Sequence, residues 1–140
     1  MSKPRPVRAA VVAAMAIAAT LFTGSAAAAA TVDQTPPTTT FIGYSEGFYC
    51  LTLIIEADRS SDNVTPAAQL RYEAWDDGVF IGTLTDQNQP DGPWGVLQMT
   101  KPGPNTITVF VVDAAGNRSA PSNQRVVTGY YTPGCTPYHF

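Results

Sequence analysis

The sequence predicts an all-β fold, a seven-stranded antiparallel sandwich, from three observations. Seven short apolar or alternating runs follow one another after residue 38, with turn residues between them. None of these runs suggests a helix. Two stretches, 70–84 and 106–117, each contain a glycine turn, Asp77-Gly78 in the first and the letters DAAGN in the second. Many short strands separated by turns are typical of a sandwich.

The first 30 residues predict a secretory signal peptide. Three basic residues precede an almost wholly apolar run at 9–22, and small residues follow from 24 to 30. The apolar run has about 14 residues, whereas a membrane span needs about 20. We therefore expect cleavage after Ala28 or Ala30, and a secreted, soluble product with no membrane association.

The next residues predict a linker and the first two strands. Residues 31–40, TVDQTPPTTT, indicate an extended Thr/Pro-rich linker or an edge strand. A short strand is expected at 39–44. Residues 49–57, YCLTLIIEA, are β-branched and apolar on both faces, which predicts a deeply buried second strand. A polar turn follows at 60–66.

The third and fourth strands are expected to form a hairpin. Residues 70–75 alternate, which places Leu70, Tyr72 and Ala74 on one face and Arg71, Glu73 and Trp75 on the other. Asp77-Gly78 is a strong signal for a tight hairpin turn. The chain should return along 79–84 and then enter a loop at 87–93.

Three more strands complete the predicted sandwich, which spans 41–128. They are expected at 94–100, 106–112 and 124–128, with turns at 101–104 and 113–117 between them. The run at 106–112, TITVFVV, has the strongest strand character of the chain. Residues 129–140 form an aromatic tail.

Two stretches of this pattern resemble the fibronectin type III family. They read SSDNVTPAAQLRYEAWDDGVFIGTL and NTITVFVVDAAGNRSAPSN, and the resemblance covers 34–128. More narrowly, they are similar to modules of secreted actinobacterial proteins. The resemblance implies an Ig-like/fibronectin type III sandwich that serves as a binding, spacer or adhesion module, commonly an accessory part of extracellular glycosidases. The family's second-strand tryptophan corresponds to Ala57, and its sixth-strand tyrosine to Asn105 or Ile107, so two core aromatics are absent.

Charge excludes two classes of partner. Without the signal segment, five basic residues face eleven acidic ones, which gives a net charge of −6. Nucleic acids and anionic membranes both attract basic surfaces. We therefore expect neither as a partner of the secreted protein.

No set of residues predicts catalysis, a cofactor or a metal site. His139 is the only histidine, and a penultimate residue is poorly placed to hold a general base. Asp76 and Asp77 can be read as the carboxylate pair of a glycosidase, but the following glycine favours hairpin-turn residues. Asp113 and Asn117 offer oxygens to calcium, yet an Asx-type turn also explains both. The expectation is a protein that is not an enzyme.

Cys50 and Cys135 are expected to form a disulfide. An even number of cysteines in an exported chain favours pairing, whereas a metal site needs three or four ligands. Cys50 opens the second strand and Cys135 follows the seventh, and these positions lie at the same end of a seven-stranded antiparallel sandwich. The bridge would tie the tail at 129–140 to the domain, with α-carbons about 4.4–6.8 Å apart.

Trp75 and Phe110 form the candidate ligand surface. In a fibronectin-like sandwich the third and sixth strands are neighbours, which places both rings side by side on the outer face. Such a pair can bind an extracellular polysaccharide or a protein, unless the C-terminal tail covers it. The alternative function is a small secreted inhibitor or effector that acts through loop 87–93. Either product is expected to be a monomer.

Overall fold

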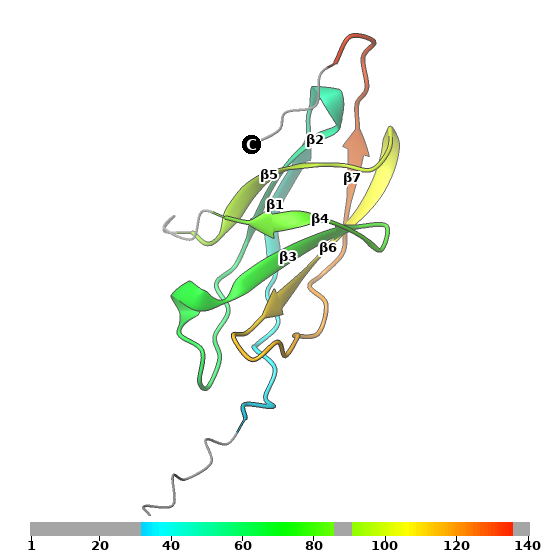
Figure 1. Ribbon diagram of the computed structural model, residues 1–140. Coiled ribbons are helices and arrows are strands. Elements are labelled where there is room, and N and C mark those ends of the chain that lie inside the picture. Colours follow the sequence, from blue (N-terminus) through cyan, green and yellow to red (C-terminus); the bar gives the residue numbers. More distant parts are fainter. Residues whose placement is uncertain (1–31, 86–90, 136–140) are drawn as a thin grey trace, which may run out of the picture. The chain divides into compact units, whose positions relative to one another are not determined.

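Two antiparallel sheets pack face to face in the structure, a computed structural model that describes residues 32–85 and 91–135 (Figure 1). The first sheet has the order β1-β2-β5, with β1 at Ile42–Gly47, β2 at Thr52–Ala57 and β5 at Trp94–Gln98. The second has the order β4-β3-β6-β7, with β3 at Arg71–Asp76, β4 at Val79–Leu84, β6 at Gly103–Val112 and β7 at Arg125–Gly129. The prediction of an all-β sandwich with seven antiparallel strands is confirmed.

Three expectations fall on residues outside the described part of the chain. They are the signal peptide at 1–30, most of loop 87–93, and His139. Among the described residues, no helix has the length and apolar character that a membrane span needs.

Two short 3-10 turns correct the expectation that the chain after the predicted signal peptide contains no helix. They are η1 at Tyr49–Leu51 and η2 at Ala67–Gln69. Because of η1, the second strand begins at Thr52 rather than at residue 49. Cys50 and Leu51 have φ angles of 63° and 59°, a left-handed conformation that a strand does not tolerate.

The first strand also starts later than predicted, at Ile42 instead of residue 39. Thr40 donates its hydroxyl to the carbonyl of Asp58 at 2.6 Å, and the Asp58 amide donates to the carbonyl of Phe41 at 2.8 Å. Residues 39–41 are therefore held by the segment that follows β2, and regular pairing begins only at Ile42, opposite Ala57.

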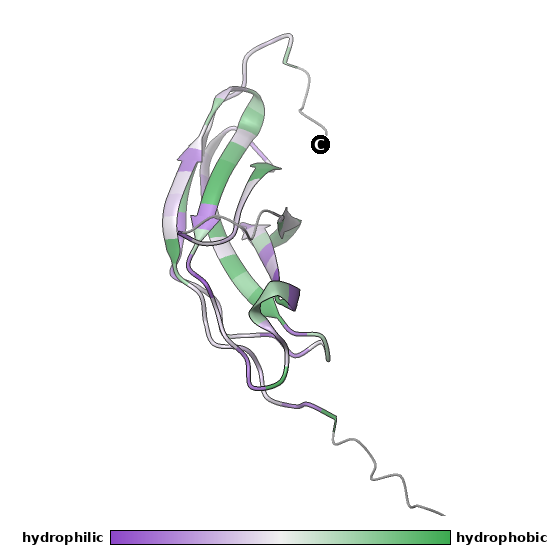
Figure 2. Ribbon diagram, turned by 90° about the vertical axis from the view of Figure 1, so that its left-hand side faces the viewer, coloured by the Kyte–Doolittle hydropathy of each residue, from purple (hydrophilic) through white to green (hydrophobic). Residues whose placement is uncertain are grey.

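The core lies between the inner faces of the sheets. Figure 2 shows hydrophobic residues concentrated in the strands. In β2 only alternate residues are buried, which are Leu53, Ile55 and Ala57, so the expectation of burial on both faces is wrong. The opposing sheet contributes further buried side chains, including Tyr72, Ala74, Ile107, Val109 and Val111.

Side chains from the β6–β7 connection and β7 close one side of the sandwich. The Ile42 amide donates to Asn123 Oδ1 at 2.6 Å. Arg125 Nη2 donates to the carbonyls of Ile42 and Gly43, both at 3.1 Å. These bonds satisfy backbone groups at the outer edge of β1, which would otherwise be free to pair with another chain.

Candidate functional site

Trp75 and Phe110 stand side by side on the outer face of the four-stranded sheet. Trp75 lies opposite Thr108 in the β3–β6 register, and Glu73 lies opposite Phe110. The two ring centroids are 6.1 Å apart and the planes meet at 78°, an edge-to-face arrangement. Phe80 of β4 joins them, with its centroid 5.7 Å from that of Trp75. Trp75, Phe80 and Phe110 are called the aromatic face below.

Arg118 covers part of the aromatic face, and the sequence interpretation missed it. Its guanidinium carbon lies 3.7 Å from the Phe110 centroid and 4.4 Å from the Trp75 centroid. Glu73 forms two ion pairs, one with Arg118 at 3.3 Å and one with Arg71 at 2.9 Å. Cation–π contacts of this kind contribute about 0.5–1 kcal/mol at exposed sites. Arg118 reaches the rings because the chain folds back after the DAAGN turn and bridges to Val112.

A groove of about 470 Å³ opens beside these rings. Its walls combine aromatic, charged and hydroxyl- or amide-bearing side chains, and they comprise Trp75, Asp77, Gly78, Thr106, Thr108, Phe110, Arg118, Pro121 and Gln124. The indole N–H of Trp75 is buried and has no hydrogen-bond acceptor in the structure. The groove therefore offers apolar ring surface together with several hydrogen-bonding groups.

The described part of the C-terminal tail does not cover the aromatic face. The Leu51 amide donates to the carbonyl of Tyr130 at 2.8 Å, and the rings of Tyr49 and Tyr130 lie 6.4 Å apart. These contacts place residues 129–135 against η1. The disulfide between Cys50 and Cys135 is confirmed, with α-carbons 5.2 Å apart.

Asp76 and Asp77 do not form a carboxylate pair. Asp76 is fully buried within β3, and its Oδ2 accepts hydrogen bonds from the amide and the hydroxyl of Thr100, both at 2.7 Å. The expectation that Asp76 is a turn residue is therefore wrong. Asp77 does occupy the hairpin turn, with φ angles of 46° there and 83° at Gly78. Since β-strand side chains alternate, one carboxylate faces the core and the next faces solvent.

Asp77 links the hairpin to the turn before β6. Lys101 Nζ lies 2.5 Å from Asp77 Oδ2, and the Thr106 amide donates to Asp77 Oδ1 at 3.1 Å. The hydrogen bond from Lys101, and then that from Thr106, holds the pKa of Asp77 below its usual value. The same contact raises the pKa of Lys101.

The depressed pKa of Asp77 predicts a loss of stability in acid. A carboxyl group whose pKa is lower in the folded state stabilises the protein above its unfolded pKa of about 3.9, and this contribution disappears as the pH falls through the folded value. We expect wild type to have a higher melting temperature than Asp77→Asn at pH 7, and the gap to close as the pH falls below the unfolded pKa and through the lower folded one. Thermal unfolding of both proteins between pH 7 and pH 2 measures this. A gap that does not change with pH would contradict the assignment.

Comparison with known proteins identifies a fold and no family. No family model matches the chain, and no curated protein matches it. Among solved structures, the fibronectin(III)-like modules of Clostridium thermocellum CbhA are similar, with a TM-score of 0.50 and 21% identity over 75% of this chain. The fold is fibronectin type III-like. This chain spans about half of that one, 52% of its length.

Two other solved structures are similar at lower TM-scores. The spore cortex lytic enzyme SleM of Clostridium perfringens has a TM-score of 0.47 and 14% identity, over 66% of this chain and 28% of that one. A family 28 exopolygalacturonase of Yersinia enterocolitica has a TM-score of 0.49 and 12% identity, over 71% of this chain and 21% of that one.

Ala57, Asn105 and Ile107, where the resemblance implied that core aromatics are absent, are all buried in the sandwich. Ala57 is buried at the position expected for a tryptophan. Asn105 is also fully buried, and its Nδ2 donates to the carbonyls of Lys101 at 3.0 Å and Gly103 at 2.7 Å. The amide therefore secures the turn before β6.

Proposed function

We propose that this protein is a secreted, non-catalytic binding module whose working surface is the groove beside Trp75 and Phe110. The observation that carries the proposal is the combination of clustered rings with a groove of about 470 Å³ on the outer face of the four-stranded sheet. Ligand sites commonly pair apolar and aromatic walls with a few polar groups that fix orientation. The signal-like N-terminus and the Cys50–Cys135 disulfide support an extracellular location, because disulfides persist in oxidising compartments.

An extracellular polysaccharide is the ligand class that the groove suits best. Sugar rings present C–H faces that pack on aromatic surfaces, and their hydroxyls need hydrogen-bonding partners. Thr106, Thr108 and Gln124 supply such partners along the same groove as the rings. The resemblance to accessory modules of secreted actinobacterial proteins points in the same direction.

Arg118 sets the expected strength of binding. Its guanidinium already lies over the rings, so a sugar must pack beside it or displace it. Its side chain is 38% exposed, which leaves it room to move. Displacement would cost about 0.5–1 kcal/mol of cation–π energy. Weak binding by a single module follows, with useful retention only on a surface that presents many copies of the ligand.

The alternative of an inhibitor acting through loop 87–93 has less support. Residues 86–90 lie outside the described part of the chain. At the other end of the loop, Gly92 and Pro93 are buried, and a Cβ on Gly92 would lie only 2.0 Å from the carbonyl oxygen of Ala57. The part of the loop that the structure describes therefore packs against the sandwich.

Retention on insoluble polysaccharides tests the proposal. Aromatic pairs contribute about 0.5–1.5 kcal/mol beyond area burial, so we expect Trp75→Ala to weaken retention on chitin or cellulose by up to about tenfold. The variant should remain folded, because Trp75 lies on the outer face. Tyr131→Ala is the matched control, since Tyr131 is 59% exposed and lies outside the groove. If wild type and Trp75→Ala are retained equally on every polysaccharide to which the wild-type protein binds, the proposed surface is refuted.

A further inference from the structure

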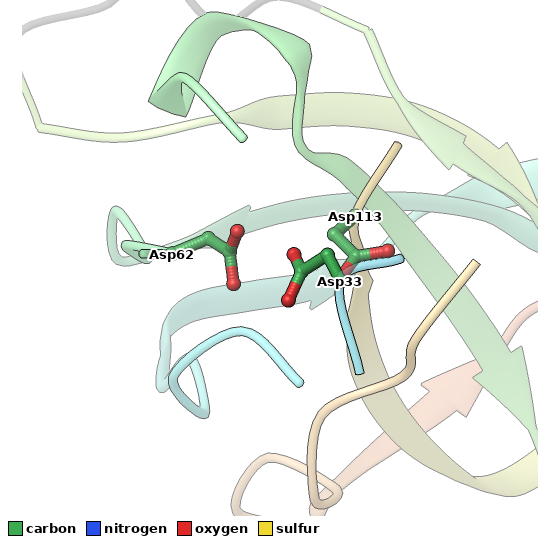
Figure 3. Close-up of side chains that lie close together, drawn as sticks. All are labelled: Asp33, Asp62 and Asp113. Carbon is green, nitrogen blue, oxygen red and sulfur yellow. The ribbon is translucent and has the colours of Figure 1, made fainter. Parts of the chain in front are cut away.

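Three aspartates from distant parts of the chain converge at one end of the sandwich. Asp33 precedes β1, Asp62 lies in the turn after β2, and Asp113 begins the turn after β6. One carboxylate oxygen of each lies within 4.8 Å of the others. Figure 3 shows the three carboxylates, each carried by a different segment. Of these three aspartates, the sequence interpretation considered only Asp113 as a possible calcium ligand, together with Asn117.

Local hydrogen bonds orient each of these carboxylates. Asp62 Oδ2 accepts from the amides of Val64 at 3.0 Å and Thr65 at 2.7 Å. Asp33 Oδ1 accepts from the amide of Thr35 at 3.0 Å. In both cases one oxygen is used by the turn, and the other is left for a different partner.

Asp113 is held in the same way by the turn that it begins. Its Oδ1 accepts from the amide of Asn117 and its Oδ2 from the Asn117 side-chain amide, both at 2.7 Å. The turn is therefore closed by bonds from Asn117, four residues on, and not by the bond to the amide two residues on that defines the expected Asx-type turn. Asp113 is only 5% exposed, and its oxygens keep lone pairs that these two bonds do not use.

The remaining oxygens of Asp33 and Asp62 are buried without a donor. Asp33 Oδ2 and Asp62 Oδ1 each expose less than 1 Å² and have no hydrogen-bond partner in the structure. Figure 3 shows these two carboxylates facing one another. Buried carboxylate oxygens without a partner are strongly unfavourable, and a cation between them would remove the penalty. The rest of each side chain is partly exposed, but these two oxygens are shielded from water, and this favours a bound cation between them.

We propose that Asp33, Asp62 and Asp113 bind a calcium ion. Ca–O bonds of about 2.3–2.6 Å allow two donors on one ion to be up to about 5 Å apart, which accommodates the observed 4.8 Å. The ligands offered are all carboxylate oxygens, which suit hard divalent cations and not zinc or copper. Calcium tolerates irregular geometry and completes its shell with water, whereas magnesium requires a compact octahedron.

The ion would fix the segment that leads into the sandwich. Asp33 belongs to this segment, and its carbonyl already accepts a hydrogen bond from Asn117 Nδ2 at 3.0 Å. Thr38 of the same segment donates its amide to the carbonyl of Ser61 at 2.8 Å. A calcium ion would neutralise the three carboxylates. It would also hold residues 33–38 against the turn after β2 and the turn after β6. The direction in which the chain enters the domain would then depend on calcium.

Calorimetric titration and thermal unfolding of the EDTA-treated protein test the site at constant ionic strength. We expect saturable binding of one calcium ion per chain. At ten times the dissociation constant, calcium should raise the melting temperature by about 4 °C or more. Magnesium chloride at the same concentration should give a clearly smaller shift. A failure to bind calcium at 10 mM, on the order of the weakest extracellular calcium sites, would overturn the proposal.

Two matched variants separate calcium binding from general charge effects. Asp33→Asn removes one ligand charge but can still accept the Thr35 hydrogen bond, so it should bind calcium at least about tenfold more weakly. Asp58→Asn removes the same charge from an exposed aspartate outside the cluster and should respond to calcium as wild type does. In EDTA, Asp33→Asn should melt no lower than wild type, because it relieves repulsion among the carboxylates. Equal calcium responses in the two variants would refute the site.

Discussion

Replacing both Cys50 and Cys135 with serine is expected to lower the free energy of unfolding by roughly 4.5 kcal/mol. The two residues are 85 positions apart, so the bridge closes most of the domain into one loop and restricts the unfolded chain. It also holds Tyr130 of the tail beside Tyr49. Denaturant unfolding of wild type and the double variant, at the same pH and calcium concentration, measures the difference.

Reduction of the wild-type protein provides the control for this substitution. Wild type treated with a thiol reductant should unfold at the same denaturant concentration as the untreated double serine variant. If the double variant is within about 1 kcal/mol of oxidised wild type, the bridge does not stabilise the fold as loop closure predicts.

A second large effect is expected from Ile55→Ala, with Ile54→Ala as its control. Ile55 is fully buried between the sheets, whereas its neighbour on β2 is half-buried on the other face. Truncating a buried isoleucine costs about 2–5 kcal/mol, because apolar contacts are lost and a cavity remains. We expect the change at Ile54 to cost less than half as much. Denaturant midpoints of the two variants compare them directly.

The pair of isoleucine variants also tests which way β2 faces. If Ile54→Ala is as destabilising as Ile55→Ala, both faces of the strand are equally packed. That result would favour the burial expected from the run YCLTLIIEA and would contradict the alternation seen in the structure.

Features carried by local patterns were predictable from the sequence. The alternation at 70–75 and the Asp77-Gly78 turn predicted β3, its hairpin with β4, and the outward direction of Trp75. The strong run at 106–112 lies within β6. The pairing of Cys50 with Cys135 followed from cysteine number and sandwich topology. Each of these inferences depends on strand periodicity or on where strands end, and both can be read from the local sequence.

Features that depend on long-range contacts were not predictable. The run at 49–57 looks like one strand, but the disulfide and the bond from Leu51 to Tyr130 support a left-handed turn at its start. Asp76 precedes a glycine turn and resembles a turn residue, yet Thr100 from another part of the chain stabilises it in the interior.

The candidate sites show the same limitation. No local pattern placed Arg118 over the aromatic face, because its position depends on how the DAAGN turn folds back onto β3 and β6. The convergence of Asp33, Asp62 and Asp113 likewise requires three loops to meet. Single residues were identified from the sequence, but their partners became visible only in the fold.

The fluorescence of Trp75 reports binding in the adjacent groove, which we propose to be a polysaccharide site. The protein has two tryptophans, so Trp94→Phe leaves Trp75 as the only indole reporter. Titration of this variant with soluble chitin and cellulose oligosaccharides should change its emission saturably for one of the two series, with the weak affinity expected for a single module. If a saccharide series is bound, as calorimetry would show, and the Trp75 emission does not change, the ligand lies elsewhere and the claim is wrong.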